Sequence, residues 1–329
     1  MTVASLLTKA LSGQLAGARG RFADGLTRTI LRRTQLHGDE DPALLPFHEI
    51  GSFSEYQEYR ARMAAAERKR RLIETLLAAE QEPFRYPGYN ALIGREVEFL
   101  VDYQHSYERV DGLLLPNYRE RLVCSVTNLN NRLRAILLAM QHLIGLRLLR
   151  ARIYATERLS PFFTFLQRRF PGAMGSEYLG GGVPRGVEKD GVRNEDVTAL
   201  TFDDDTFDVV ITNDVLEHVP RFDKAYRELF RVLAPGGTLL VTVPFIAAQY
   251  DHLLRAVVNP SGEVEHLLPP DYHGDPIRPE GVLCYQYFGW KVLDDLRSVG
   301  FQKAGALFYW SLYHGLLGQN QVIFFARKD

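Results

Sequence analysis

The chain has few cysteines, almost no net charge and no long apolar run, and each absence excludes a class of protein. Cys124 and Cys284 lie far apart in the 329-residue sequence, so we expect no disulfide framework. A formal net charge of −1 gives no sign of a nucleic-acid partner. No apolar stretch reaches the roughly 18 residues that a membrane span needs, and residues 1–20 lack a signal-peptide pattern. We therefore expect a cytoplasmic protein with no membrane span.

What the chain does have is an ordinary globular composition and one segment with a clear periodic pattern, residues 200–245. Its apolar, β-branched run at 207–212 predicts a buried parallel strand. An amphipathic helix is expected over 220–233, then Pro235-Gly236-Gly237, then a second strand over 238–243. This strand–helix–strand order predicts an α/β protein with a Rossmann-like sheet and helices on both of its faces.

The same segment resembles the second half of class I S-adenosylmethionine-dependent methyltransferases, of the type 11 kind. The resemblance lies in the phrase L-x-F-x-D-x-x-F-D-V-V, the L-E-H of 216–218 and the R-V-L-x-P-G-G-x-L that begins at Arg231. It implies a seven-stranded sheet with a reversed last hairpin and the cofactor S-adenosyl-L-methionine. It also implies methyl transfer to an O or N nucleophile of a small-molecule or glycan-type acceptor.

The cofactor residues are expected where the first strands of this sheet end. The first strand, over 152–157, lacks the glycine-rich turn of the family and continues instead through Tyr154-Ala155-Thr156-Glu157. Glu177, at the end of a strand over 173–178, is expected to accept hydrogen bonds from the ribose hydroxyls. The resemblance implies an adenine site at Asp196 and Val197 and a methionine site at Asn213 and Asp214. The full predicted cofactor set is Thr156, Glu157, Ser176, Glu177, Asp196, Val197, Asn213 and Asp214.

Residues 246–288, which we name the lid segment, are expected to shape the acceptor site. An insertion of this length is usually functional or disordered, and its aromatic content argues against disorder. Histidine is the natural base near neutral pH, so we predict His218 and His273 as catalytic candidates, with Tyr272 orienting His273. The spacing of His266 and His273 is not that of a helical metal site, and we predict no metal.

The amino-terminal part is expected to form two smaller regions. Residues 1–83 are predicted to be helical. Their basic segment 1–37 suits a membrane surface or, alternatively, packing on its own domain or a partner subunit, and Ser52 to Glu55 have capping-box spacing before a helix to about residue 79. Residues 84–145 resemble a degenerate zinc-knuckle module of β-hairpin type. Of its four metal positions, 90, 93, 124 and 127, only Cys124 keeps a thiol.

Residues 146–329 are then the Rossmann-like methyltransferase domain. Two alternatives stay open: a catalytically inactive binding or scaffold protein, and an enzyme of this fold with non-methylating chemistry. A nicotinamide-dependent oxidoreductase is disfavoured because G-x-G-x-x-G is absent. The sequence leaves the acceptor and a homo-oligomeric state open.

Overall fold

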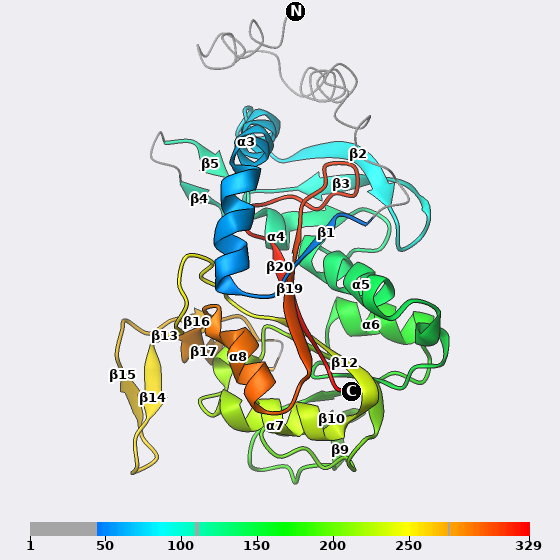
Figure 1. Ribbon diagram of the computed structural model, residues 1–329, viewed down its shortest axis with the longest axis vertical. Helices are drawn as coiled ribbons and strands as arrows, with labels where there is room; N and C mark the ends of the chain where they lie inside the picture. The colour runs from blue at the N-terminus through cyan, green and yellow to red at the C-terminus, as the bar shows by residue number, and fades with distance from the viewer. Residues whose placement is uncertain (1–44, 109–111, 276) are drawn as a thin grey trace, which may run out of the picture. The chain divides into compact units, whose positions relative to one another are not determined.

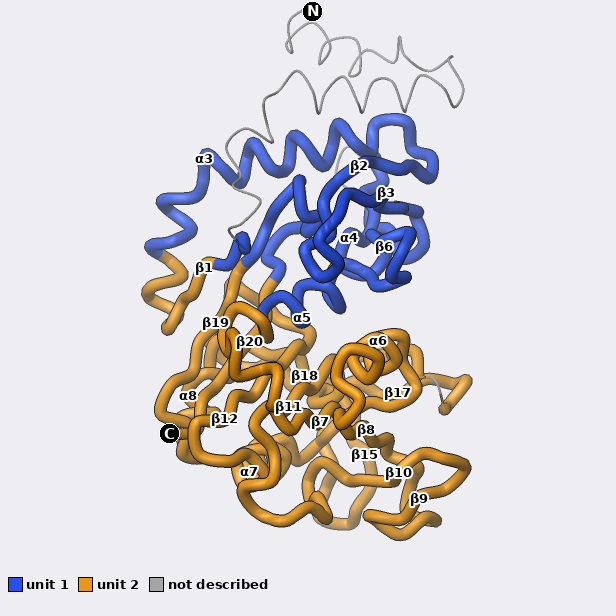
Figure 2. The backbone as a smooth tube through the Cα atoms, turned by 90° about the vertical axis from the view of Figure 1, so that its right-hand side faces the viewer, with its two compact units in different colours: residues 1–47, 58–139, 309–321 blue, residues 48–57, 140–308, 322–329 orange. Residues whose placement is uncertain are grey.

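The computed structural model describes residues 45–108, 112–275 and 277–329 (Figure 1). The predicted basic segment 1–37 lies outside the described residues. The chain divides into two compact units (Figure 2). Residues 58–139 and 309–321 make up most of the first unit, and 48–57, 140–308 and 322–329 make up the second. The stretch 309–321 was predicted as part of the methyltransferase domain, whereas in the structure it packs within the first unit.

The first unit is built on a β-hairpin, as the sequence predicts. Strand β2 (Phe84–Asn90) pairs antiparallel with β3 (Arg95–Val101), which pairs in turn with β6 (Leu122–Cys124). The side-chain amide of Asn90 donates to the Cys124 sulfur over 3.2 Å, so two of the four knuckle positions do meet. The remaining elements are α3 (Phe53–Leu77), β4 (Tyr107–Glu108), β5 (Leu114–Leu115), α4 (Tyr118–Arg121) and α5 (Asn131–Ile144).

A buried carboxylate in this unit, Glu74, gives a pH-dependent prediction. It accepts hydrogen bonds from the Trp310 indole N–H and the Gly318 N–H, both over 2.8 Å, and burial raises its pKa above the ordinary value. A raised pKa means that the folded state binds the proton more tightly, so ionised Glu74 opposes folding at neutral pH. Glu74→Gln keeps an acceptor oxygen for both donors, so we expect urea unfolding to find it more stable than the parent at pH 8. The gap should narrow by pH 5 as the parent takes up its proton; a widening gap would contradict this assignment.

The second unit contains a nine-stranded sheet whose order is β1-β19-β20-β12-β11-β7-β8-β10-β9. Strands β7, β8, β10, β11 and β12 are parallel, and β20 is reversed between β12 and β19. The predicted α/β fold with its reversed last hairpin is therefore confirmed, and β1 and β9 extend the seven expected strands at the two edges. The strands are β1 (Phe47–Ile50), β7 (Ile153–Ala155), β8 (Met174–Glu177), β9 (Glu188–Lys189), β10 (Val192–Asn194), β11 (Phe207–Asn213), β12 (Leu233–Thr242), β19 (Lys303–Tyr309) and β20 (Val322–Arg327).

The helices of this unit follow from the strand order. Crossovers between parallel strands are right-handed, and the path reverses between β7–β8 and β11–β12, so the two crossover helices cover opposite faces. In Figure 2, α6 and α7 accordingly lie on opposite sides of the strands. Ser160 caps the start of α6, since its hydroxyl accepts from the Phe163 N–H over 3.0 Å. The helical elements are η1 (Gly145–Arg150), α6 (Pro161–Arg169), η2 (Leu216–His218), α7 (Phe222–Val232) and α8 (Lys291–Ser298).

The lid segment is ordered by three short antiparallel pairs, seen in yellow and orange in Figure 1. Their strands are two or three residues long, and no sequence periodicity marks them. The pairs are β13 (Leu253–Leu254) with β18 (Gln286–Tyr287), β14 (Ala256–Val258) with β15 (Val264–His266), and β16 (Tyr272–His273) with β17 (Val282–Leu283).

Among the described helices, none is both long and apolar enough to cross a membrane.

Candidate active site

The strand order reverses beside β7, and this places a topological switch point at the carboxyl ends of β7 and β11. From β7 the chain runs outward through β8 and β10, and it then returns to the other side of β7 as β11. Ligands of open α/β sheets bind at such a switch point. The predicted cofactor residues lie at or shortly after the carboxyl ends of β7, β8, β10 and β11, so the topology brings them to one edge of the sheet.

Two of these residues join β7 to β11 across the switch point. The Asn213 side-chain amide donates to Glu157 Oε1 over 2.5 Å, and the Thr156 N–H donates to the Ile211 carbonyl over 3.0 Å. The Thr156 hydroxyl and the Asn213 side-chain oxygen Oδ1 are buried and have no hydrogen-bond partner among the described residues. A buried polar group without a partner is costly, so these two atoms suit a polar ligand at the switch point.

Glu177 holds the loop between β7 and α6. Its Oε1 accepts from the Arg158 and Leu159 N–H groups over 2.7 and 2.8 Å. Burial raises the pKa of this half-buried carboxylate. Ser176 differs from the rest of the predicted set, because its buried hydroxyl already hydrogen-bonds the Tyr154 hydroxyl over 2.7 Å.

A glycine on the neighbouring strand, Gly175, lies against the loop that stands where the glycine turn was expected. A Cβ on Gly175 of β8 would lie 2.6 Å from the Glu157 carbonyl oxygen and 2.5 Å from the Phe163 ring. Only glycine allows the loop to pass this close to the strand. The sequence signal for it was present, a glycine inside a short strand, but the predicted site did not include Gly175.

Replacing Gly175 with alanine should therefore displace the loop that carries Glu157. We expect Gly175→Ala to lower the free energy of unfolding by about 1–3 kcal/mol, because the added methyl overpacks a backbone contact, and to weaken binding of any ligand at the switch point. Thermal unfolding and calorimetric titration measure the two effects. Gly182→Ala is the matched control, since a Cβ there meets nothing within 4 Å. Equal stability of the two variants would rule out this role for Gly175.

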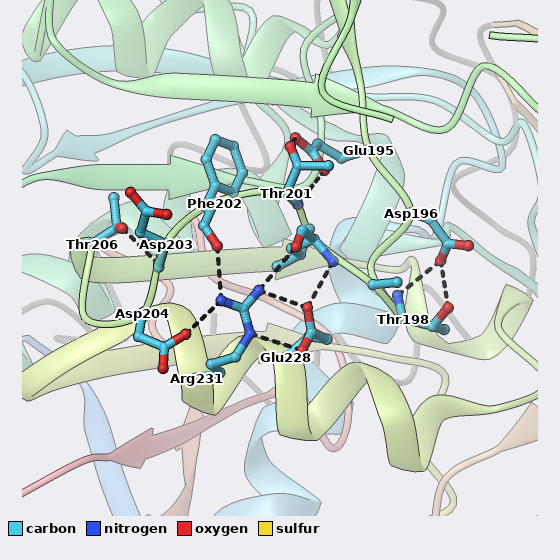
Figure 3. Close-up of polar contacts among 12 residues, drawn as sticks. Glu195, Asp196, Thr198, Thr201, Phe202, Asp203, Asp204, Thr206, Glu228 and Arg231 are labelled. Carbon is cyan, nitrogen blue, oxygen red and sulfur yellow. Dashed lines mark hydrogen bonds and ion pairs between the residues drawn. The ribbon is translucent and has the colours of Figure 1, made fainter. Parts of the chain in front are cut away.

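Asp196 lies after β10 in a tightly braced loop (Figure 3). Its Oδ1 accepts from the N–H and the hydroxyl of Thr198 over 2.8 and 2.7 Å. Arg231 of α7 braces the far side of the loop through the carbonyl oxygens of Leu200 and Phe202, over 2.9 and 2.8 Å. The loop is therefore held by its own Asp196–Thr198 contacts and by Arg231 of α7. Val197 is buried beside Asp196.

The predicted bases His218 and His273 come together although they are 55 positions apart in the sequence. Their rings are perpendicular, with centroids 5.1 Å apart. Between them lies Glu217, whose side chain is fully buried. Its Oε1 is 3.8 Å from His218 Nε2 and 3.6 Å from His273 Nδ1, within ion-pair range but too far for hydrogen bonds. Burial raises the pKa of Glu217, and Glu217 in turn raises the pKa of His273.

Each histidine faces an oxygen with its second ring nitrogen, at hydrogen-bond distance for His218 and at ion-pair distance for His273. His218 Nδ1 lies 2.9 Å from the Leu283 carbonyl oxygen of the lid segment. His273 Nε2 lies 3.6 Å from Asp271 Oδ2, and the Tyr287 hydroxyl donates to that same carboxylate. Tyr272, predicted as the orienting group of His273, is instead an exposed side chain. Asp271 is within ion-pair range of His273, on the side of the ring away from Glu217.

The lid segment is fastened to the helical turn that carries Glu217. The Tyr285 N–H donates to the Glu217 carbonyl over 2.7 Å, and the Gln286 side chain donates to the Leu216 carbonyl over 2.6 Å. Cys284, which directly precedes Tyr285, is buried, and burial raises the pKa of its thiol to about 12. The role of Glu217 could not be predicted from the sequence, because only the tertiary structure places it between two histidines.

Comparison with known proteins was made on sequence and on structure. Residues 183–241 match the family described as Methyltransferase domain. The chain is 46% identical over 59 residues to the ubiquinone/menaquinone biosynthesis C-methyltransferase UbiE of Hydrogenovibrio crunogenus, covering 16% of this chain and 23% of that protein. It is 31% identical over 108 residues to a demethylmenaquinone methyltransferase of Streptomyces avermitilis, covering 29% and 47%. The chain thus spans less than half the length of these relatives.

A solved S-adenosylmethionine-dependent methyltransferase of Mesorhizobium loti aligns with this chain at 16% identity and a TM-score of 0.35. The alignment covers 54% of this chain and 91% of the Mesorhizobium loti chain. The matched family segment, residues 183–241, covers most of the segment 200–245 from which the resemblance was predicted. The resemblance is therefore confirmed over that segment.

Proposed function

We propose that this chain transfers a methyl group from S-adenosyl-L-methionine to a small-molecule acceptor. Its residues 183–241 match the methyltransferase domain family. The observation that carries the proposal is the switch point of the sheet, where two buried polar atoms have no partner within the described residues. S-adenosylmethionine supplies an electrophilic methyl group on a sulfonium. The protein has to hold it in line with the acceptor.

The cofactor would lie over the ends of β7, β8, β10 and β11. Glu177 accepts hydrogen bonds from the ribose hydroxyls, because it ends β8 and carries a half-buried carboxylate. Asp196 and the Val197 N–H face the adenine edge. Asn213 and Asp214 accept from the methionine ammonium, since Asn213 ends β11 and Asp214 directly follows it. Thr156 and Glu157 border the same crevice through the bond from Asn213 to Glu157.

Activation of the acceptor is assigned to the cluster of Glu217, His218 and His273. Glu217 and His218 lie in η2, shortly after the end of β11, and His273 lies in β16 of the lid segment. An acceptor hydroxyl or amine has to lose a proton when it is methylated, and imidazole accepts protons near neutral pH. The same requirement applies to a ring carbon that is activated by an ionised neighbouring hydroxyl.

Candidate acceptors divide by the atom that receives the methyl group. The relative from Hydrogenovibrio crunogenus is named as a C-methyltransferase of ubiquinone and menaquinone biosynthesis. A further relative, from Caenorhabditis elegans, is named as a phosphoethanolamine N-methyltransferase and is 33% identical over 48 residues. We propose an oxygen or nitrogen nucleophile, or a carbon beside an ionised oxygen, as the class that fits a base-containing site. The glycan-type acceptor stays a prediction.

The proposal is tested with S-adenosylmethionine labelled in its methyl group. The chain is incubated with the small-molecule fraction of its host cells, and labelled products are found by mass spectrometry. We expect acceptor-dependent label that falls at least about tenfold in His218→Ala and His273→Ala, the size of effect usual for an acid–base group. Exposed His266→Ala is the control. Cofactor binding without any label in products would point to the non-methylating alternative.

A further inference from the structure

We propose that Glu217, His218 and His273 bind one divalent transition-metal ion. This reverses the expectation of no metal, which rested on the sequence spacing of other histidines. The three residues offer a carboxylate oxygen and two imidazole nitrogens, and these atoms all lie within 4.8 Å of one another. Two nitrogens and one oxygen form a ligand set used by Zn²⁺ and by other first-row divalent ions.

The distances suit a shared ion better than direct hydrogen bonds. Glu217 Oε1 lies 3.6 and 3.8 Å from the two nearest ring nitrogens, well beyond a hydrogen bond. Metal–ligand bonds of about 2.0–2.2 Å at tetrahedral angles separate neighbouring ligand atoms by about 3.4 Å. Small movements of the two histidine rings toward an ion beside Glu217 would therefore complete the site.

The buried carboxylate is the second, independent observation. The Glu217 side chain is fully buried, and neither of its oxygens accepts a hydrogen bond within the described part of the chain. A buried carboxylate without hydrogen-bond donors is strongly unfavourable unless a positive charge compensates it. A divalent ion between Glu217 and the two rings supplies that charge.

The second nitrogen of each ring supports the same assignment. The Leu283 carbonyl oxygen lies at His218 Nδ1, and the Asp271 carboxylate lies toward His273 Nε2. Metal-bound histidines typically donate their other ring N–H to a carbonyl or a carboxylate, which fixes the tautomer and the ring orientation. When His218 Nδ1 donates to Leu283, the His218 nitrogen that points at Glu217 is the unprotonated one, as a metal requires.

Three protein ligands leave a coordination position open for another molecule. On the proposed function, an acceptor oxygen bound there would lose its proton more readily. The two imidazoles would then serve as ligands, and the ion would take over the activation of the acceptor. Metal binding itself does not depend on the proposed function, so the two proposals can fail separately.

The test is Co²⁺ and Zn²⁺ titration of the full chain, prepared without a histidine tag and stripped with a chelator, with no cofactor present. We expect one equivalent of Co²⁺ to give a visible absorption spectrum that Zn²⁺ abolishes. Glu217→Gln and His273→Ala should each weaken binding at least about tenfold, the loss typical of a disrupted metal site. His266→Ala, an exposed histidine of the lid segment, should bind like the parent.

Cys284→Ser separates this site from the neighbouring group of Asp271, His273 and Cys284. We expect an unchanged Co²⁺ spectrum in that variant. A thiolate band that disappears with Cys284→Ser would overturn the assignment, and so would Co²⁺ affinity that survives in both Glu217→Gln and His273→Ala. Thermal unfolding of each variant checks that it is folded. A stripped parent that binds less than one equivalent would also overturn the proposal.

Discussion

Glu177→Ala should weaken S-adenosylmethionine binding by about 100-fold. The change removes the acceptor proposed for the ribose hydroxyls, and two lost charge-assisted hydrogen bonds are together worth about 3 kcal/mol or more. It also frees the loop after β7, because the Arg158 and Leu159 N–H groups lose the oxygen that holds them. Both effects act on the same crevice. Calorimetric titration of the parent and the variant with S-adenosylmethionine measures the change.

Two further variants separate the two roles of Glu177. Glu177→Gln keeps one acceptor oxygen for the loop but removes the charge, so we expect an intermediate loss of affinity and parent-like thermal stability. Exposed Glu188→Ala in β9 of the same sheet should bind like the parent. If Glu177→Ala binds with unchanged affinity, the ribose assignment is wrong.

Trp290→Ala should lower the free energy of unfolding of the second unit by about 3–5 kcal/mol, the usual cost of removing a large buried aromatic side chain. Trp290 lies between the lid segment, which ends at residue 288, and α8, which begins at Lys291. Its ring is 1% exposed and lies against Tyr56 and Phe245, with centroids 4.8 and 5.4 Å away. Its indole N–H donates to the Ala247 carbonyl over 2.9 Å, which ties the two ends of the lid segment together. Denaturant unfolding measures the loss.

Trp290→Phe is the matched control, because it keeps most of the ring and removes the hydrogen bond to Ala247. We expect a loss of about 1–3 kcal/mol, largely from the buried carbonyl left without its donor. A Trp290→Ala variant as stable as Trp290→Phe would show that ring packing does not anchor the lid segment.

Local chemistry was enough to predict most of the sheet and its helices. The β-branched run of β11, the Ser160 cap of α6 and the capping box before α3 each act within a few residues. The structure shows half of the capping box: the Glu55 N–H donates to the Ser52 hydroxyl over 3.2 Å, whereas the Glu55 carboxylate accepts from the N–H of Gly51, one residue before the cap, over 2.7 Å. Signals of this range are fully present in the sequence.

The parts that could not be predicted depend on contacts between distant segments. Glu217 becomes a buried carboxylate between histidines only when the lid segment folds back onto η2 through Tyr285. Gly175 matters because the loop at Glu157 passes over it. The lid strands hold two or three residues each, too few for a periodic pattern.

The central claim is that the switch point of the sheet binds S-adenosylmethionine despite the missing glycine turn. It is tested most directly by calorimetric titration of the full chain with S-adenosylmethionine and S-adenosylhomocysteine. We expect one site for each, with a Kd of about 100 µM or tighter. Absence of binding of both ligands at about 1 mM, a free energy weaker than about −4 kcal/mol, would contradict the account and favour a binding or scaffold protein that has kept only the fold.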